Sequence, residues 1–266
     1  MRLSSVLCRM LWSCLLVVPA AQGADRRVAF VGCPILRNTT LPCWLGETGG
    51  ELYYLGPQGD LTADFYPPEF RHKMLVQGVV SDQPRICGGL VLKPVKVSVL
   101  PALDINCNVM LPAAAYPDPP NKRGSGPSGV KGGALPPAPP RPVPAIFAAP
   151  YTTRTFTAVF DADSERLWRP AQVAVETAAR YATEARASTI DILAYRASFR
   201  LSDGTDYVEA KSIGQSRARA IEQALITVGV PRESRIVVRW KTAAMPSNQL
   251  QENNRAQSVS ITVKPG

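Results

Sequence analysis

The fold of the C-terminal half of the chain is decided by the stretch Ile213-Gly214-Gln215-Ser216-Arg217-Ala218-Arg219-Ala220-Ile221. This stretch lies within a helix that apolar spacing predicts from about Tyr207 to Val228, with Ile213, Ile221 and Leu225 on its apolar side. Gly229 then supplies a C-terminal stop, because glycine adopts the left-handed conformation that ends many helices.

Further elements are predicted on both sides of this helix. Upstream, Pro170 opens another helix, where its missing N–H costs nothing. The apolar stripe of that helix is made of small side chains that let it lie close to a sheet: Ala171, Val175, Ala178 and Ala182. Strands are predicted at Thr155–Phe160, Ile190–Ala197, Arg235–Trp240 and Gln257–Val263. The expected order is β-α-β-α-β-β.

Residues 154–264 resemble the OmpA-like C-terminal domain, the family that attaches outer-envelope proteins to peptidoglycan. The nine-residue stretch looks like the family's Leu-Ser-x-x-Arg-Ala-x-x-Val. Further likenesses are the opening Val159-Phe160-Asp161, the strand Ile190–Tyr195 before the family's Gly-His/Tyr-Thr-Asp, and Asn254-Arg255 before the last strand. The resemblance implies a non-enzymatic binding domain.

The resemblance also implies a ligand site. In the family an Asp and the Arg of Arg-Ala hold the diaminopimelate of the peptidoglycan stem peptide, an acid for its ammonium and a guanidinium for its carboxylate. Arg217 matches the Arg, whereas the Asp position falls on Ala197. Asp203, 14 residues before Arg217, is the candidate substitute, although Asp203-Gly204 between strand-like runs is more typical of a hairpin turn. The candidate peptidoglycan-binding residues are Arg217, Asp203, Asp206, Arg196 and Arg255.

Residues 24–111 form a separate β domain in this interpretation. About five short strand-like runs without a helical period favour a small barrel such as an OB-fold. Its aromatic side chains are expected either in the core of this barrel or on a binding platform: Trp44, Tyr53, Tyr54, Phe65 and Tyr66.

Four cysteines lie in this β domain: Cys33, Cys43, Cys87 and Cys107. An even number in an exported domain predicts two disulfides, which compensate for a small core. The spacing leaves all three pairings open. A zinc site is the alternative, but no Cys-x-x-Cys pair is present.

Two further segments flank the domains. Residues 1–23 read as a signal peptide, with Arg2 and Arg9 before an apolar run of 11 residues and Ala21-Gln22-Gly23 at the cleavage site. Residues 112–150 hold 12 of the 25 prolines and 5 glycines, which predicts an extended tether between the β domain and residues 151–266. We expect the two domains to fold independently around it.

Composition excludes several classes of function. Hydrophobic residues make up 45% and charged residues 19% of the 266, so the chain can build a core. A net charge of +9 without a Lys/Arg run is not typical of a nucleic-acid-binding protein. One histidine, His72, leaves little scope for a catalytic base or a metal cage, so neither enzyme activity nor a cofactor is expected. The acids Asp161, Asp163 and Glu165 crowd one loop but are more typical of a helix cap.

The sequence therefore supports two hypotheses for a protein of the Gram-negative periplasm. In the first, the C-terminal domain binds peptidoglycan, and the β domain docks on another envelope protein. In the second, the OmpA-like domain has lost peptidoglycan binding and makes protein contacts within an envelope assembly. Arg217 favours the first hypothesis and Ala197 the second. No membrane-spanning segment is expected after the leader.

Overall fold

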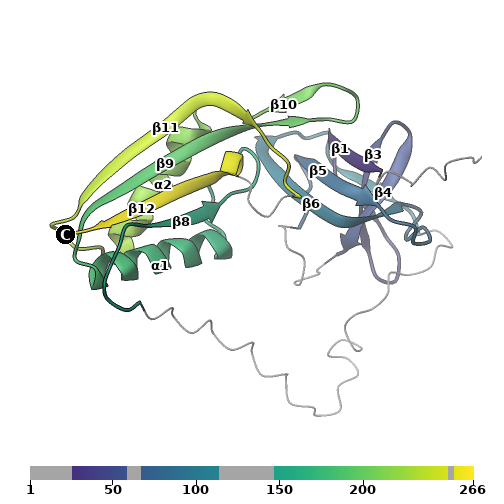
Figure 1. Cartoon of the computed structure of the whole chain (residues 1–266). Coiled ribbons are helices and arrows are strands. Elements are labelled where there is room, and N and C mark those ends of the chain that lie inside the picture. Colours follow the sequence, from purple (N-terminus) through teal and green to yellow (C-terminus); the bar gives the residue numbers. More distant parts are fainter. Residues whose placement is uncertain (1–25, 59–66, 114–146, 251–254) are drawn as a thin grey trace, which may run out of the picture.

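A computed structural model describes residues 26–58, 67–113, 147–250 and 255–266 of the chain. These residues form two α-helices and two β-sheets, which confirms the α+β class (Figure 1). No helix among them is long and apolar enough to cross a membrane. The expected leader, most of the tether, Phe65 and Tyr66 lie outside the described residues.

The C-terminal domain has the predicted order with one extra strand. Its sheet runs β10-β9-β12-β8, and β11 pairs in parallel with β9. Both helices lie on one face of the sheet and contact each other across a shared apolar core. The elements are β8 (Arg154–Val159), α1 (Arg169–Glu184), β9 (Ala187–Arg200), β10 (Asp206–Val208), α2 (Ile213–Val228), β11 (Arg235–Pro246), the 3-10 helix η2 (Arg255–Gln257) and β12 (Ser258–Pro265).

Local sequence explains the helices and one correction. The small-residue stripe of α1 is buried along its whole length, as predicted. Gly229 ends α2 in the left-handed conformation, with φ 95°. The predicted start of α2 at Tyr207 is wrong, because Tyr207 pairs with Phe199 in the hairpin of β9 and β10. The helix begins only at Ile213.

The N-terminal domain is one curved sheet of seven strands, ordered β1-β5-β6-β4-β3-β2-β7. The five runs expected from the sequence fall on β1, β4, β5 and two parts of β6, so the prediction missed β3 and also β2 and β7, which are three residues each. Among the described residues no pairing joins β1 to β7, so the sheet is open rather than a closed barrel. The strands are β1 (Arg27–Gly32), β2 (Ile35–Arg37), β3 (Cys43–Thr48), β4 (Glu51–Pro57), β5 (His72–Val80), β6 (Leu90–Leu103) and β7 (Val109–Leu111).

Two disulfides are present, as predicted, and they join Cys33 to Cys107 and Cys43 to Cys87. Three of these four cysteines are fully buried, and Cys33 is half-buried. The aromatic side chains of Trp44, Tyr53 and Tyr54 lie in the core of the sheet, which agrees with the core alternative for these three residues.

An apolar interface joins the two domains, which the sequence reading did not predict. Strand β5 is buried on both faces: Met74 and Val76 pack into the N-terminal core, whereas Leu75 faces the C-terminal domain. Leu75 and Leu100 of the N-terminal sheet form one buried cluster with residues of the C-terminal domain: Ala162, Ala197, Phe199 and Ala256.

Hydrogen bonds surround this interface. The β9–β10 hairpin reaches β1 (Figure 1), where Ser202 N donates to Ala29 O and Ala29 N donates to Ser202 Oγ, both at 2.8 Å. Nearby, Gln249 donates its backbone N–H to Gln77 Oε1 at 2.7 Å and its side-chain amide to Ser98 Oγ at 3.1 Å. Gln77 and Ser98 are only 5% and 2% exposed, so the C-terminal domain satisfies polar groups that docking buries.

This interface predicts that the two halves stay together after the tether is cut. The test replaces residues 124–129 with a specific protease site and follows the cleaved chain by size-exclusion chromatography. Both disulfides lie within the N-terminal domain, so co-elution would depend on non-covalent contacts alone. Leu201→Glu places a charge at the apolar contact and should weaken docking by about 1–3 kcal/mol. The two fragments of this variant should therefore elute separately. Val208→Glu, exposed on the same hairpin, is the matched control. Separate elution of the unsubstituted halves would contradict the interface.

Candidate functional site

The candidate site is organised around a buried ion pair between Arg217 of α2 and Glu209. Both side chains are 0% exposed, and Nη2 of Arg217 lies 2.6 Å from Oε1 of Glu209. Nη1 donates to Oε2 at 3.1 Å, so the contact is two-pronged. The remaining N–H groups of the guanidinium donate to the backbone carbonyls of Asp161, Ser164 and Tyr195. All five donors of Arg217 are therefore used inside the protein.

The Glu209 carboxylate lies against Ala197, the position where the resemblance led us to expect an Asp. Its Oε2 accepts a hydrogen bond from the backbone N–H of Ala197 at 2.6 Å, and its Oε1 accepts one from Asp163 N at 2.9 Å. The buried Ala197 side chain instead joins the apolar cluster with Phe199. Sequence reasoning did not select Glu209 as the partner of Arg217.

The other candidate residues from the sequence lie elsewhere. Asp203 is exposed at the hairpin turn, where it accepts hydrogen bonds from the N–H and hydroxyl of Thr205. Asp206 pairs with Arg200 at 3.2 Å on the surface of the same hairpin. Arg196 donates to the backbone carbonyls of Glu209 and Thr242. Arg255 begins η2, ahead of β12. The structure thus brings none of the side chains of Asp203, Asp206 and Arg196 to Arg217.

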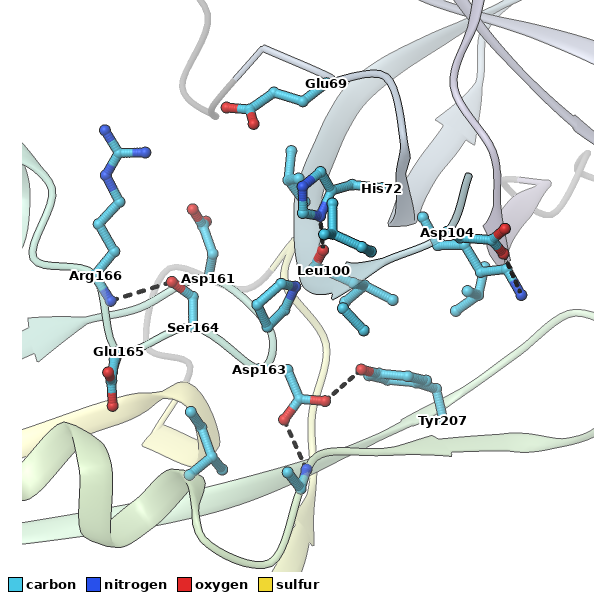
Figure 2. Close-up of a pocket in the computed structure, with 18 of the residues that line it drawn as sticks. Glu69, His72, Leu100, Asp104, Asp161, Asp163, Ser164, Glu165, Arg166 and Tyr207 are labelled. Atoms are coloured by element: carbon cyan, nitrogen blue, oxygen red, sulfur yellow. Dashed lines mark hydrogen bonds and ion pairs between the residues drawn. The ribbon is translucent and has the colours of Figure 1, made fainter. Parts of the chain in front are cut away.

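A cleft of about 1240 Å³ opens beside the ion pair, between the two domains (Figure 2). The C-terminal domain contributes the loop after β8 and the approach to α2. The N-terminal domain contributes β5 and the end of β6. The charged and polar lining consists of Glu69, His72, Lys73, Asp104, Asp161, Asp163, Ser164, Glu165, Arg166, Tyr207 and Ser212.

Two acids of the loop after β8 differ in their environments. Asp163 is engaged, since it accepts hydrogen bonds from the Tyr207 hydroxyl and from Ala210 N. Burial and the neighbouring Asp163 carboxylate raise the pKa of Tyr207, which keeps its hydroxyl protonated as a donor. The Asp161 carboxylate makes no hydrogen bond or ion pair with any described residue. Burial raises the pKa of Asp161 to about 6, against the opposing attraction of Lys96, Arg217 and Arg166.

This arrangement presents charged groups of both signs to a ligand. Carboxylates of Asp161, Glu165 and Glu69 can accept hydrogen bonds from an ammonium group, and Lys73 and Arg166 carry the opposite charge. No group of three or more His, Cys, Asp or Glu side chains in the described part of the chain is placed to hold a metal ion. The nitrogen Nδ1 of His72 is engaged with the carbonyl oxygen of Leu100 at 2.8 Å.

Comparison with known proteins finds partial similarity to solved structures. One is the OmpA-like domain of FopA1 from Francisella tularensis, with 16% identity over 43% of this chain and 76% of that one (TM-score 0.30). Another is the peptidoglycan-associated lipoprotein from Burkholderia pseudomallei, with 21% identity over 42% of this chain and 90% of that one (TM-score 0.30). A third is a putative MotB-like protein from Desulfovibrio vulgaris, with 12% identity over 43% and 74% (TM-score 0.31).

No protein-family model and no curated protein sequence matches the chain. OmpA-like and peptidoglycan-associated proteins are nevertheless among the similar structures, as the sequence resemblance led us to expect. In each case the similarity covers about two fifths of this chain.

Replacing Arg217 tests the ion pair. Arg217→Met leaves the Glu209 carboxylate buried without its counter-charge, which should cost about 3–5 kcal/mol of unfolding free energy. Arg217→Lys should restore little, because a single ammonium cannot replace five donors in a planar fork. Arg219→Met removes an exposed pair with Glu222 on the same helix and should cost about 1 kcal/mol or less. Urea denaturation followed by tryptophan fluorescence measures all three, and equal losses for Arg217→Met and Arg219→Met would contradict the burial of the pair.

The raised pKa of Asp161 predicts a dependence of stability on pH. The folded chain binds this proton more tightly than the unfolded chain, whose Asp titrates near 3.8. Stability relative to Asp161→Asn should therefore increase as the pH falls from 7 through 6, and level off below about 4. The full change is about 3 kcal/mol, at 1.4 kcal/mol per pKa unit. Parallel urea denaturation of both proteins between pH 4 and 7 measures it. A constant difference across that range would show that Asp161 has an ordinary pKa.

Proposed function

We propose that this protein is a non-enzymatic component of the bacterial cell envelope that associates with peptidoglycan. The observation that carries the proposal is the position of the cleft, which is lined by the Asp161–Arg166 loop, whose Asp161 and Ser164 carbonyls Arg217 binds, and by the start of α2. The OmpA-like motifs of the sequence place the family's ligand at the corresponding Arg. Two disulfides support an oxidising compartment such as the periplasm.

In this proposal the ligand contacts the cleft rather than the guanidinium itself. Arg217 is a positioning residue: it holds the Asp161–Ser164 segment through two backbone carbonyls. Asp161 receives the ammonium of a diaminopimelate side chain, because its carboxylate lines the cleft and has no partner among the described residues. An ammonium would also keep Asp161 ionised at neutral pH, since opposite charge stabilises the anionic form.

Cosedimentation of the full chain with isolated cell-wall sacculi tests the proposal. We expect Asp161→Asn to weaken binding roughly tenfold or more, the loss of one charge-assisted contact. Asp203→Asn, which removes the same charge at the exposed hairpin turn, should leave binding unchanged. Sacculi whose free amines have been acetylated should bind the wild-type chain weakly. Failure of the wild-type chain to sediment with untreated sacculi would refute the proposal.

Docking on another envelope protein is the second candidate function. The sealed pair of Arg217 and Glu209 favours it, because a ligand carboxylate reaches Arg217 only if internal hydrogen bonds break. Exposed apolar side chains at the end of β6, on the following loop and in β7 also favour it, with Leu103 68%, Ile105 73% and Met110 58% exposed. If the folded chain does not bind sacculi, docking on another protein becomes the better explanation.

A further inference from the structure

The N-terminal domain forms one wall of the cleft that the OmpA-like domain would otherwise leave open (Figure 2). Its contributions come from the beginning of β5, with His72 and Lys73, and from the end of β6, with Leu100 and Asp104. The interface fixes this wall, because Leu75 and Leu100 on the same two strands are buried against the C-terminal domain. The position of the wall therefore follows from the packing of the two domains.

The wall also changes the charges that a ligand meets. In the C-terminal domain the guanidinium of Arg217 is closed off by Glu209 and three backbone carbonyls. The N-terminal wall brings a second cation, Lys73, whose side chain is 50% exposed. Its ammonium lies 3.4 Å from the Asp104 carboxylate, an exposed pair that costs little to exchange for another anion.

We infer that the ligand site is shared by both domains and that Lys73 of the N-terminal domain binds the ligand carboxylate in place of Arg217. This inference rests on the proposed association with peptidoglycan. A stem peptide would lie across the cleft, with the ammonium of its diaminopimelate at Asp161 of one domain and another of its carboxylates at Lys73 of the other. The N-terminal domain is then a part of the binding site, and docking of the domains is a condition for binding.

Charge reversal at Lys73 tests this division of roles in the full chain. Lys73→Glu should weaken cosedimentation with sacculi on the order of tenfold, because it replaces attraction of a carboxylate by repulsion. Lys93→Glu is the matched control: it makes the same charge change at an exposed position of β6 that does not line the cleft. Circular dichroism and thermal denaturation should show that both variants are folded.

Sacculi with amidated carboxyl groups separate recognition from a general structural effect. If Lys73 contacts a carboxylate, the wild-type chain should bind amidated sacculi weakly, and Lys73→Glu should weaken that binding no further. Binding of Lys73→Glu at the wild-type level, together with loss of binding by Asp161→Asn, would overturn the shared site and leave peptidoglycan association intact. Absence of binding by the wild-type chain would overturn both.

Discussion

The buried ion pair of Arg217 and Glu209 ties together the parts of the C-terminal domain that border the cleft. Through Arg217, α2 holds the loop after β8 by the carbonyls of Asp161 and Ser164. Through Glu209, the segment before α2 holds the backbone N–H groups of Ala197 in β9 and Asp163 in the same loop. Charges removed from water must be matched by such a network, because an unpaired buried charge costs several kcal/mol. The shape of the cleft thus depends on a pair that is not itself part of the cleft lining.

Much of the fold could be predicted from local sequence. Both helices are marked by signals that involve only neighbouring residues. These signals are Pro170, the small-residue stripe of α1 and the left-handed Gly229. The start of α2 was misjudged because Tyr207 and Val208 continue an apolar pattern but pair with β9 instead. The short strands β2 and β7 escaped notice because three residues carry no periodicity. These two strands form only through pairing with residues far away in the chain, and a single sequence does not reveal such pairing.

The candidate site was harder to predict than the fold. Arg217 was found through its motif, but its partner was sought at Asp203 by spacing alone. Asp203 belongs to the turn that returns the chain along β10, and only after that turn does Glu209 reach Ala197. One signal for the domain interface was present in the sequence. The run Met74-Leu75-Val76 is apolar on both faces of β5, which is typical of a strand buried on both sides.

The docking of the two domains and the buried Arg217–Glu209 pair together determine which charges line the cleft. Because Glu209 pairs with Arg217, the C-terminal domain by itself lines the cleft with the acids of the loop after β8 and with Arg166. The docked N-terminal sheet adds Lys73, and it also contributes to the surroundings of Asp161 through Lys96. A cation next to a buried acid lowers the cost of keeping that acid ionised, so Lys96 opposes the effect of burial, which is the larger of the two and leaves the pKa of Asp161 raised. The contact between the domains is therefore made by the apolar cluster of Leu75, Leu100 and Phe199, while Lys96 reduces the electrostatic cost of burying Asp161.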